Sequence, residues 1–124
     1  MISKILLVED EPLNQEVALE LLRDVGFEPD LAVNGIQAVE MGLTGAYAVI
    51  LMDMQMPIMD GVEASRALRA GGCNAQIVAM TGNALAEDRI RCGAAGMDGF
   101  MTKPVEPEEL FATLLRCLSG RQAV

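Results

Sequence analysis

The chain has 124 residues, which suits one domain rather than two, and 52% of them are hydrophobic, which excludes a disordered chain. Eighteen acidic residues against nine basic ones give a net charge of −9, which argues against direct contact with nucleic acid or with an anionic membrane surface. We expect a single domain over residues 1–124, with an ordered core from about residue 3 to 118 and a frayed tail at 119–124.

The cysteine and histidine content limits which metals and which catalytic groups the chain can offer, and it indicates the redox compartment. The three cysteines, Cys73, Cys92 and Cys117, have no metal-ligand spacing and the chain has no histidine, so a zinc site is disfavoured and reduced thiols in a cytoplasmic protein are expected. No apolar run approaches the ~18 residues that span a bilayer, and the N-terminal run is too short for a secretory signal. Without histidine, any phosphohistidine or imidazole base must come from a partner.

Short apolar runs alternate with amphipathic segments along the chain. In order, the runs predict strands at 4–8, about 28–33, 47–53, 75–80 and 98–102. The amphipathic segments predict helices at 12–25, 35–43, 61–70, 84–92 and 107–118, with prolines, glycines or a serine at their boundaries. This alternation predicts an α/β fold: a doubly wound, five-stranded parallel sheet in the flavodoxin-like order 2-1-3-4-5, with five helices on its two faces.

Polar side chains stand where four of the predicted strands end. Glu9 and Asp10 follow the first strand, Asp53 ends the third, Thr81 follows the fourth and Lys103 follows the fifth. The carboxyl ends of parallel strands meet at one edge of a sheet, and strands 1 and 3 flank the crevice in which such sheets bind ligands. We therefore expect these residues to form one polar site.

The residue types in this site favour phosphoryl chemistry. Three neighbouring carboxylates repel one another, and a hard divalent cation such as Mg²⁺, which prefers oxygen ligands, removes that cost. Lys103 can pair with Asp53 or with a bound anion, and Thr81 can donate to a phosphoryl oxygen. Together they predict an aspartate whose carboxylate attacks phosphorus. Taken singly, Asp53 could be a helix cap or a loop carboxylate, Glu9 and Asp10 could cap the first helix, and Thr81 could belong to an ordinary turn. Lys103 alone is a weak signal, so the hypothesis depends on the set.

Four motifs carry these residues. They are Ile5-Leu6-Leu7-Val8-Glu9-Asp10, Met52-Asp53-Met54-Gln55-Met56-Pro57 with Met59-Asp60-Gly61, Ala79-Met80-Thr81 and Lys103-Pro104. In this order they resemble the receiver domains of two-component response regulators, over roughly residues 3–118. The segment Pro12-Leu13-Asn14-Gln15, the methionine-rich loop after Asp53 and Gly96-Met97-Asp98-Gly99-Phe100 are most similar to receivers attached to hybrid sensor histidine kinases.

The resemblance implies a phosphoacceptor and a metal site. Asp53 would accept a phosphoryl group from a phosphohistidine. Asp10, Asp53 and the backbone carbonyl of Gln55 would ligate Mg²⁺, and Glu9 would do so directly or through water. Glu9 stands where aspartate is more frequent in the family, and its longer side chain favours the water-mediated form.

The resemblance also implies a switch. Lys103 would bind the phosphoryl group, and Thr81 would move toward it and hydrogen-bond to it. Phe100 occupies the family's switch position and would change rotamer as Thr81 moves, and the Lys103–Pro104 peptide bond is expected to be cis. The output surface would be formed by the fourth helix, the fifth strand and the fifth helix.

A histidine kinase domain or a histidine phosphotransfer protein is the partner that the resemblance implies. Leu13, in the first turn of the first helix, is a candidate apolar contact for a donor helix. The module would accept a phosphoryl group without being an enzyme itself, although a longer parent chain can be a histidine kinase. It would lie in the cytoplasm, free or tethered to a membrane sensor kinase, with no direct contact to nucleic acid or membrane.

Other functions stay open at this point. One is an aspartyl-phosphate phosphatase or phosphotransferase on a related fold, although Gln55 stands where haloacid dehalogenase-like enzymes usually have a second aspartate. Another is a flavodoxin-like nucleotide binder, which the acidic first loop disfavours because it would repel phosphate. A constitutive docking module would keep the fold without the phosphorylation.

Overall fold

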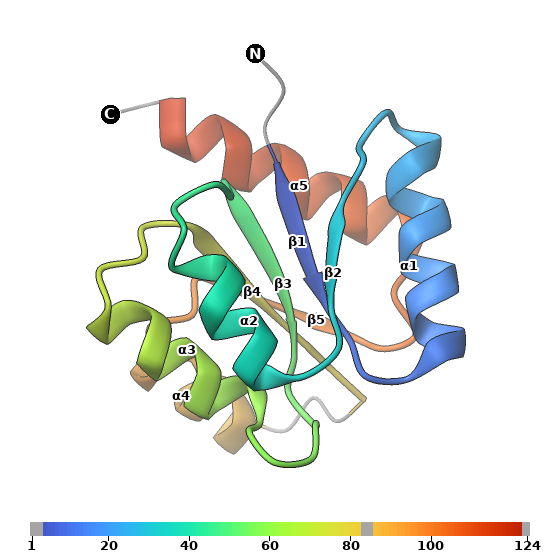
Figure 1. Ribbon diagram of the computed structural model, residues 1–124. Helices are drawn as coiled ribbons and strands as arrows, with labels where there is room; N and C mark the ends of the chain where they lie inside the picture. The colour runs from blue at the N-terminus through green and yellow to red at the C-terminus, as the bar shows by residue number, and fades with distance from the viewer. Residues whose placement is uncertain (1–3, 83–85, 123–124) are drawn as a thin grey trace.

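The structure is a computed structural model that describes residues 4–82 and 86–122. Its five strands form one parallel sheet in the order β2-β1-β3-β4-β5, which confirms the predicted α/β fold and strand order (Figure 1). The strands are β1 Ile5–Val8, β2 Asp30–Ala32, β3 Val49–Asp53, β4 Gln76–Thr81 and β5 Gly99–Thr102. The helices are α1 Pro12–Asp24, α2 Gly35–Gly42, α3 Gly61–Ala70, α4 Ala86–Ala94 and α5 Pro107–Gln122. None of the helices in the described ranges is both long enough and apolar enough to cross a membrane.

Helices cover both faces of the sheet and divide the core into two clusters. α1 and α5 lie on one face, and α2, α3 and α4 lie on the other (Figure 1). Side chains alternate along a strand, so Ile5 and Leu7 of β1 pack with the cluster under α1 and α5, while Leu6 and Val8 pack with the cluster under α2, α3 and α4. All residues of β1 and β3 are buried, as expected for parallel strands that are covered on both faces.

Two helices extend beyond the ends that the sequence predicts. α4 continues through Gly93 to Ala94, and α5 continues through Gly120 to Gln122. A glycine inside a helix costs only about 1 kcal/mol relative to alanine, so a glycine alone does not end a helix. The predicted helix ends at residues 92 and 118 are therefore wrong. Residues 84–85 of the fourth predicted helix and residues 123–124 of the tail lie outside the described residues.

The register of the sheet determines where the polar strand ends lie. β1 and β3 are paired up to Val8 and Met52, so the acidic residues that follow emerge side by side. β4 and β5 are paired up to Thr81 and Thr102, so they end at the same edge of the sheet. The fold thus brings the ends of four strands to one edge, as the strand order predicts.

Candidate functional site

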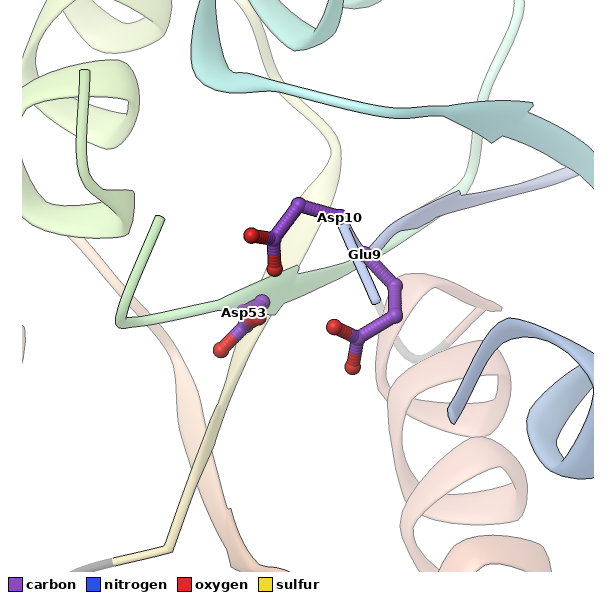
Figure 2. A group of neighbouring side chains, drawn as sticks. All are labelled: Glu9, Asp10 and Asp53. Atoms are coloured by element: carbon purple, nitrogen blue, oxygen red, sulfur yellow. The ribbon is translucent and has the colours of Figure 1, made fainter. Parts of the chain in front are cut away.

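Three acidic side chains converge at the carboxyl edge of the sheet (Figure 2). Glu9 and Asp10 lie between β1 and α1, and Asp53 is the last residue of β3. One carboxylate oxygen from each of the three lies within 4.8 Å of the others. Glu9 and Asp53 are each only 2% exposed, and Asp10 is half-buried. Buried carboxylates are unfavourable unless cations compensate them, so this cluster indicates a binding site.

Glu9 and Asp10 do not cap the N-terminus of α1. That role belongs to Glu11, whose side chain accepts a hydrogen bond of 2.8 Å from the backbone N–H of Asn14. Gln15, to which the sequence assigns no role, donates from Nε2 to the carbonyl oxygen of Glu9 over 2.8 Å and so supports the turn. The reading of Glu9 and Asp10 as helix caps is therefore wrong.

Lys103 places a positive charge within the acidic cluster. Its Nζ lies 2.8 Å from Oε1 of Glu9 and 3.1 Å from Oδ1 of Asp53. Its backbone N–H donates to the carbonyl oxygen of Thr81 over 2.7 Å, which joins the ends of β4 and β5. The Lys103–Pro104 peptide bond is cis, as the resemblance to receiver domains implies. Lys103 thus bridges two of the three acids.

Backbone contacts fix the Asp53 carboxylate and the loop that follows it. The N–H of Gln55 donates to Oδ1 of Asp53 over 3.1 Å, and the N–H of Gly61 donates to the carbonyl oxygen of Met54 over 3.2 Å. A Cβ on Gly61 would overlap the carbonyl oxygen of Asp53, so this position requires glycine. Asp60 begins α3 with a capping box. Gly61 and Asp60 therefore shape the loop that follows Asp53.

Burial determines the electrostatics of the site. Burial, reinforced by the hydrogen bond and the charge of Glu9, raises the pKa of Asp53 to about 7, against smaller opposing effects of the Gln55 N–H and of Lys103. Burial also disfavours the charge on Lys103, but Glu9 and Asp53 together hold its pKa above the ordinary value. The lysine therefore stays charged at neutral pH, and its ammonium group contacts two of the three carboxyl groups in the cluster.

The donor set fits a hard divalent cation. All the acidic side chains in the cluster offer oxygen, and neither histidine nor cysteine belongs to it, which suits Mg²⁺ better than a softer metal. A dication would offset the repulsion and desolvation that raise the pKa of Asp53. It would thereby favour the ionised carboxylate, which is the nucleophilic form.

An open cleft lies between the loop after β3 and α4. Its volume is about 400 Å³, and it is lined by Met54, Gln55, Met56, Asp60, Thr81, Asp88 and Arg91. Thr81 is 3% exposed and follows Met80, the register partner of Asp53. The cleft gives access to the strand ends from the α4 side.

Phe100 lies on β5 and contacts α4. It is half-buried, and the guanidinium carbon of Arg89 lies 4.6 Å from the centre of its ring. A guanidinium at this distance is attracted to the face of an aromatic ring. The sequence does not reveal this pair, because no regular spacing relates a residue of α4 to one of β5.

An apolar groove borders the site near α1. Its volume is about 150 Å³, and it is lined by Glu9, Leu13, Asn14, Val17, Ala18, Leu21, Met80, Lys103, Pro104 and Val105. Leu13 is 65% exposed. The groove therefore presents apolar surface directly beside the lysine of the site.

The sheet is parallel and doubly wound, and a buried aspartate that pairs with a lysine lies at the switch between β1 and β3. Together these features define a class of flavodoxin-like domains with an acidic site. The family model for the response regulator receiver domain matches residues 5–115, so the chain belongs to that family.

Individual relatives agree with this assignment. The chain is 38% identical over 128 residues to hybrid signal transduction histidine kinase B of Dictyostelium discoideum, an alignment that covers 93% of this chain and 6% of that protein. It spans 6%, 15% and 17% of the length of the first three curated relatives that it matches.

Two solved structures are also similar. The receiver domain of a sensor histidine kinase from Pseudomonas aeruginosa PAO1, with a magnesium ion coordinated in its active site cleft, has a TM-score of 0.88 and 40% identity, covering 96% of this chain and 99% of that one. The receiver domain of the Saccharomyces cerevisiae response regulator Ssk1, co-crystallised with the histidine phosphotransfer protein Ypd1, has a TM-score of 0.86 and 28% identity, covering 92% and 87%.

Proposed function

We propose that Asp53 accepts a phosphoryl group from a phosphohistidine and that phosphorylation changes the surface formed by α4, β5 and α5. The observation that carries the proposal is the buried Asp53 carboxylate, which lies 3.1 Å from Lys103 and within 4.8 Å of two further carboxylates. Membership of the receiver family supports this role over a phosphatase on a related fold.

The transfer step requires an ionised Asp53 aimed at phosphorus. A carboxylate oxygen forms the new O–P bond while the P–N bond to the donor imidazole breaks, and the bonding electron pair stays on that nitrogen. Lys103 favours the ionised carboxylate before transfer and stabilises the phosphoryl oxygens during it.

Mg²⁺ is the cofactor that this site would take, held by Asp10, Asp53 and the backbone carbonyl of Gln55. When bound, it neutralises the carboxylates and the transferring phosphoryl oxygens. Glu9 would act through water, since its Oε1 already contacts Lys103 and its Oε2 accepts from the N–H of Glu11 over 3.3 Å. The magnesium ion in the similar Pseudomonas aeruginosa receiver supports this choice of metal.

Thr81 and Phe100 would transmit the new charge. The hydroxyl of Thr81 would donate to a phosphoryl oxygen, and Phe100 would change rotamer as Thr81 moves. Phe100 already contacts α4 through Arg89, so a change at its ring would alter the α4–β5 surface. The added dianionic group would thus shift the α4–β5 surface from one of two arrangements to the other.

The donor would be a histidine kinase domain or a histidine phosphotransfer protein, because this chain has no histidine. The similar yeast receiver was solved with such a phosphotransfer protein, and the apolar groove at Leu13 offers surface for a donor helix. The module itself would act in the cytoplasm as a phosphoacceptor rather than as an enzyme, without direct contact to nucleic acid or membrane. Its parent chain would be a histidine kinase if it follows the matched relatives.

Labelling by a small phosphodonor tests this proposal. With acetyl phosphate and Mg²⁺, the wild-type protein should gain a single phosphoryl group by intact mass, and neither Asp53→Asn nor wild type in excess EDTA should gain one. Asp60→Asn is the matched control, because asparagine also caps helices and the residue lies in the same loop. Stoichiometric labelling of Asp53→Asn would contradict the assignment.

A further inference from the structure

Ile58 has an unfavourable backbone conformation in the loop after Asp53. Its φ is 73°, and among the described residues it is the one non-glycine residue with a positive φ. The N–H of Met59 donates to the carbonyl oxygen of Pro57 over 2.8 Å, which closes a γ-turn centred on Ile58. A γ-turn with positive φ at its centre is the rarer and more strained form, and a β-branched residue adopts it less readily than asparagine or glycine.

The Ile58 side chain gains no burial from this conformation. It is 81% exposed, more than any other large hydrophobic residue in the described part of the chain. By contrast, Met56 is buried in the core cluster under α2, α3 and α4, and Met59 packs against the same cluster. The turn therefore directs one apolar side chain outward between two that point inward.

The loop holds Ile58 in a fixed position. Met59 packs against Gly35 of α2 so closely that a Cβ on Gly35 would overlap the carbonyl oxygen and the side chain of Met59. Immediately afterwards, the capping box of Asp60 begins α3. An apolar side chain held outward in this way suits an interface anchor, because little conformational freedom is lost when a partner covers it.

The position of Ile58 identifies the kind of partner that would cover it. The loop between β3 and α3 and the start of α1 flank the carboxyl edge of the sheet (Figure 1). Any protein that brings a histidine to the buried Asp53 must approach that edge, where the start of α1 carries the exposed Leu13 and the loop after β3 carries the exposed Ile58. The chain has no histidine of its own, so a phosphohistidine that reaches Asp53 must belong to another domain or protein.

We propose, on the basis of the proposed function, that Ile58 is an apolar anchor for the protein phosphodonor and that the strained γ-turn serves to present it. A small phosphodonor needs only the site around Asp53, whereas a protein must also cover part of the loop that carries Ile58. The residue therefore sets the efficiency of transfer from a protein donor and leaves the transfer chemistry unchanged.

Ile58→Asn separates these two effects. Asparagine tolerates the left-handed conformation, so the variant should fold and its Tm should rise by about 4 °C. With Ypd1 from Saccharomyces cerevisiae, phosphorylated on its histidine and held below saturation, the rate of labelling should fall about tenfold. The rate with acetyl phosphate and Mg²⁺ should match that of the wild type.

Leu115→Asn is the matched control. Leu115 is 69% exposed on α5 and lines a groove with Val25 and Phe27, so it is similarly apolar and lies away from the loop after Asp53. This variant should keep the wild-type rate with both donors. A general effect of losing an exposed apolar side chain would appear in both variants.

Three outcomes would overturn the inference. Ile58→Asn could keep the wild-type rate with phosphorylated Ypd1, or it could lose the same factor with acetyl phosphate, in which case it acts through the site. The wild type could also accept from acetyl phosphate and not from Ypd1, which would contradict a protein donor as the occupant. Failure of the proposed function gives a different result, because the wild type would then accept from neither donor.

Discussion

At the residue scale, burial and the neighbouring Glu9 both disfavour the ionised form of Asp53. Burial, followed by the hydrogen bond and charge of Glu9, raises its pKa from 3.8 to about 7. The metal-free folded protein therefore holds this proton more tightly than the unfolded chain does, and the contribution of Asp53 to stability falls as the pH rises from about 4 to about 7. A cation at the site competes with the proton, so metal binding is linked to pH.

The affinity for Mg²⁺ should therefore fall about tenfold between pH ~8 and pH ~6, because Asp53 is mostly ionised at the higher pH and mostly protonated at the lower one. Titration calorimetry on the metal-free protein measures both affinities. Asp53→Asn has no proton to lose at this position, so it should bind Mg²⁺ more weakly and with little pH dependence. Equal wild-type affinities at the two pH values would refute this linkage.

Lys103 should stabilise the metal-free protein by compensating Glu9 and Asp53. Lys103→Met should lower the free energy of unfolding by about 2 kcal/mol, since it leaves two buried carboxyl groups without their cation. Mg²⁺ should restore part of that loss. Urea unfolding with and without Mg²⁺ measures both effects.

Lys4→Met provides the control for Lys103→Met. Lys4 pairs with Asp30 at 3.9 Å, and both side chains are well exposed, so its loss should change the stability by no more than about 0.5 kcal/mol. Equal losses for the two variants would mean that Lys103 makes only a surface ion pair.

At the scale of the elements, the sequence predicts the features that leave a pattern among neighbouring residues of the chain. The five strands follow from short apolar runs, and the meeting of the polar residues at the ends of four of them follows from the parallel order. The contacts of Gln15 with Glu9 and of Arg89 with Phe100 join different elements at no regular spacing, so they required the structure. The positive φ of Ile58 has no local signal either, because isoleucine rarely adopts it.

Arg69 shows how one side chain holds several elements together. From the last turn of α3, its guanidinium donates to the carbonyl oxygens of Cys73, Ala75 and Gly96 and forms an ion pair of 2.7 Å with Asp98. These contacts tie the segment before β4 to the segment before β5. They lie at the amino ends of those strands, away from the acidic site.

Arg69→Ala should lower the free energy of unfolding by about 2–3 kcal/mol, because several partly buried acceptors lose their donor. Arg66→Ala, an exposed arginine on the same helix, should change it by no more than about 0.5 kcal/mol. Urea unfolding measures both values. Similar stabilities for the two variants would show that the guanidinium contacts do not hold these segments together.

At the scale of the whole molecule, the polar site lies at one edge of the sheet, and the apolar clusters that stabilise the fold lie on its two faces. Glu9, Asp53, Thr81 and Lys103 come from four strand ends and meet beside an apolar groove at α1 and an open cleft at α4. In the proposed function the donor approaches this edge, and the response passes to the surface of α4, β5 and α5. Both depend on the same claim, that Asp53 is the residue that takes up the phosphoryl group.

Reductive trapping tests this claim most directly. Borohydride reduces an acyl phosphate to an alcohol, so it converts a phosphorylated aspartate into homoserine, which peptide mass spectrometry locates. After treatment with acetyl phosphate and Mg²⁺, the account predicts homoserine in place of Asp53, with Asp10 and Asp60 unchanged. Homoserine at another aspartate, or none in protein that has gained the phosphoryl mass, would contradict it.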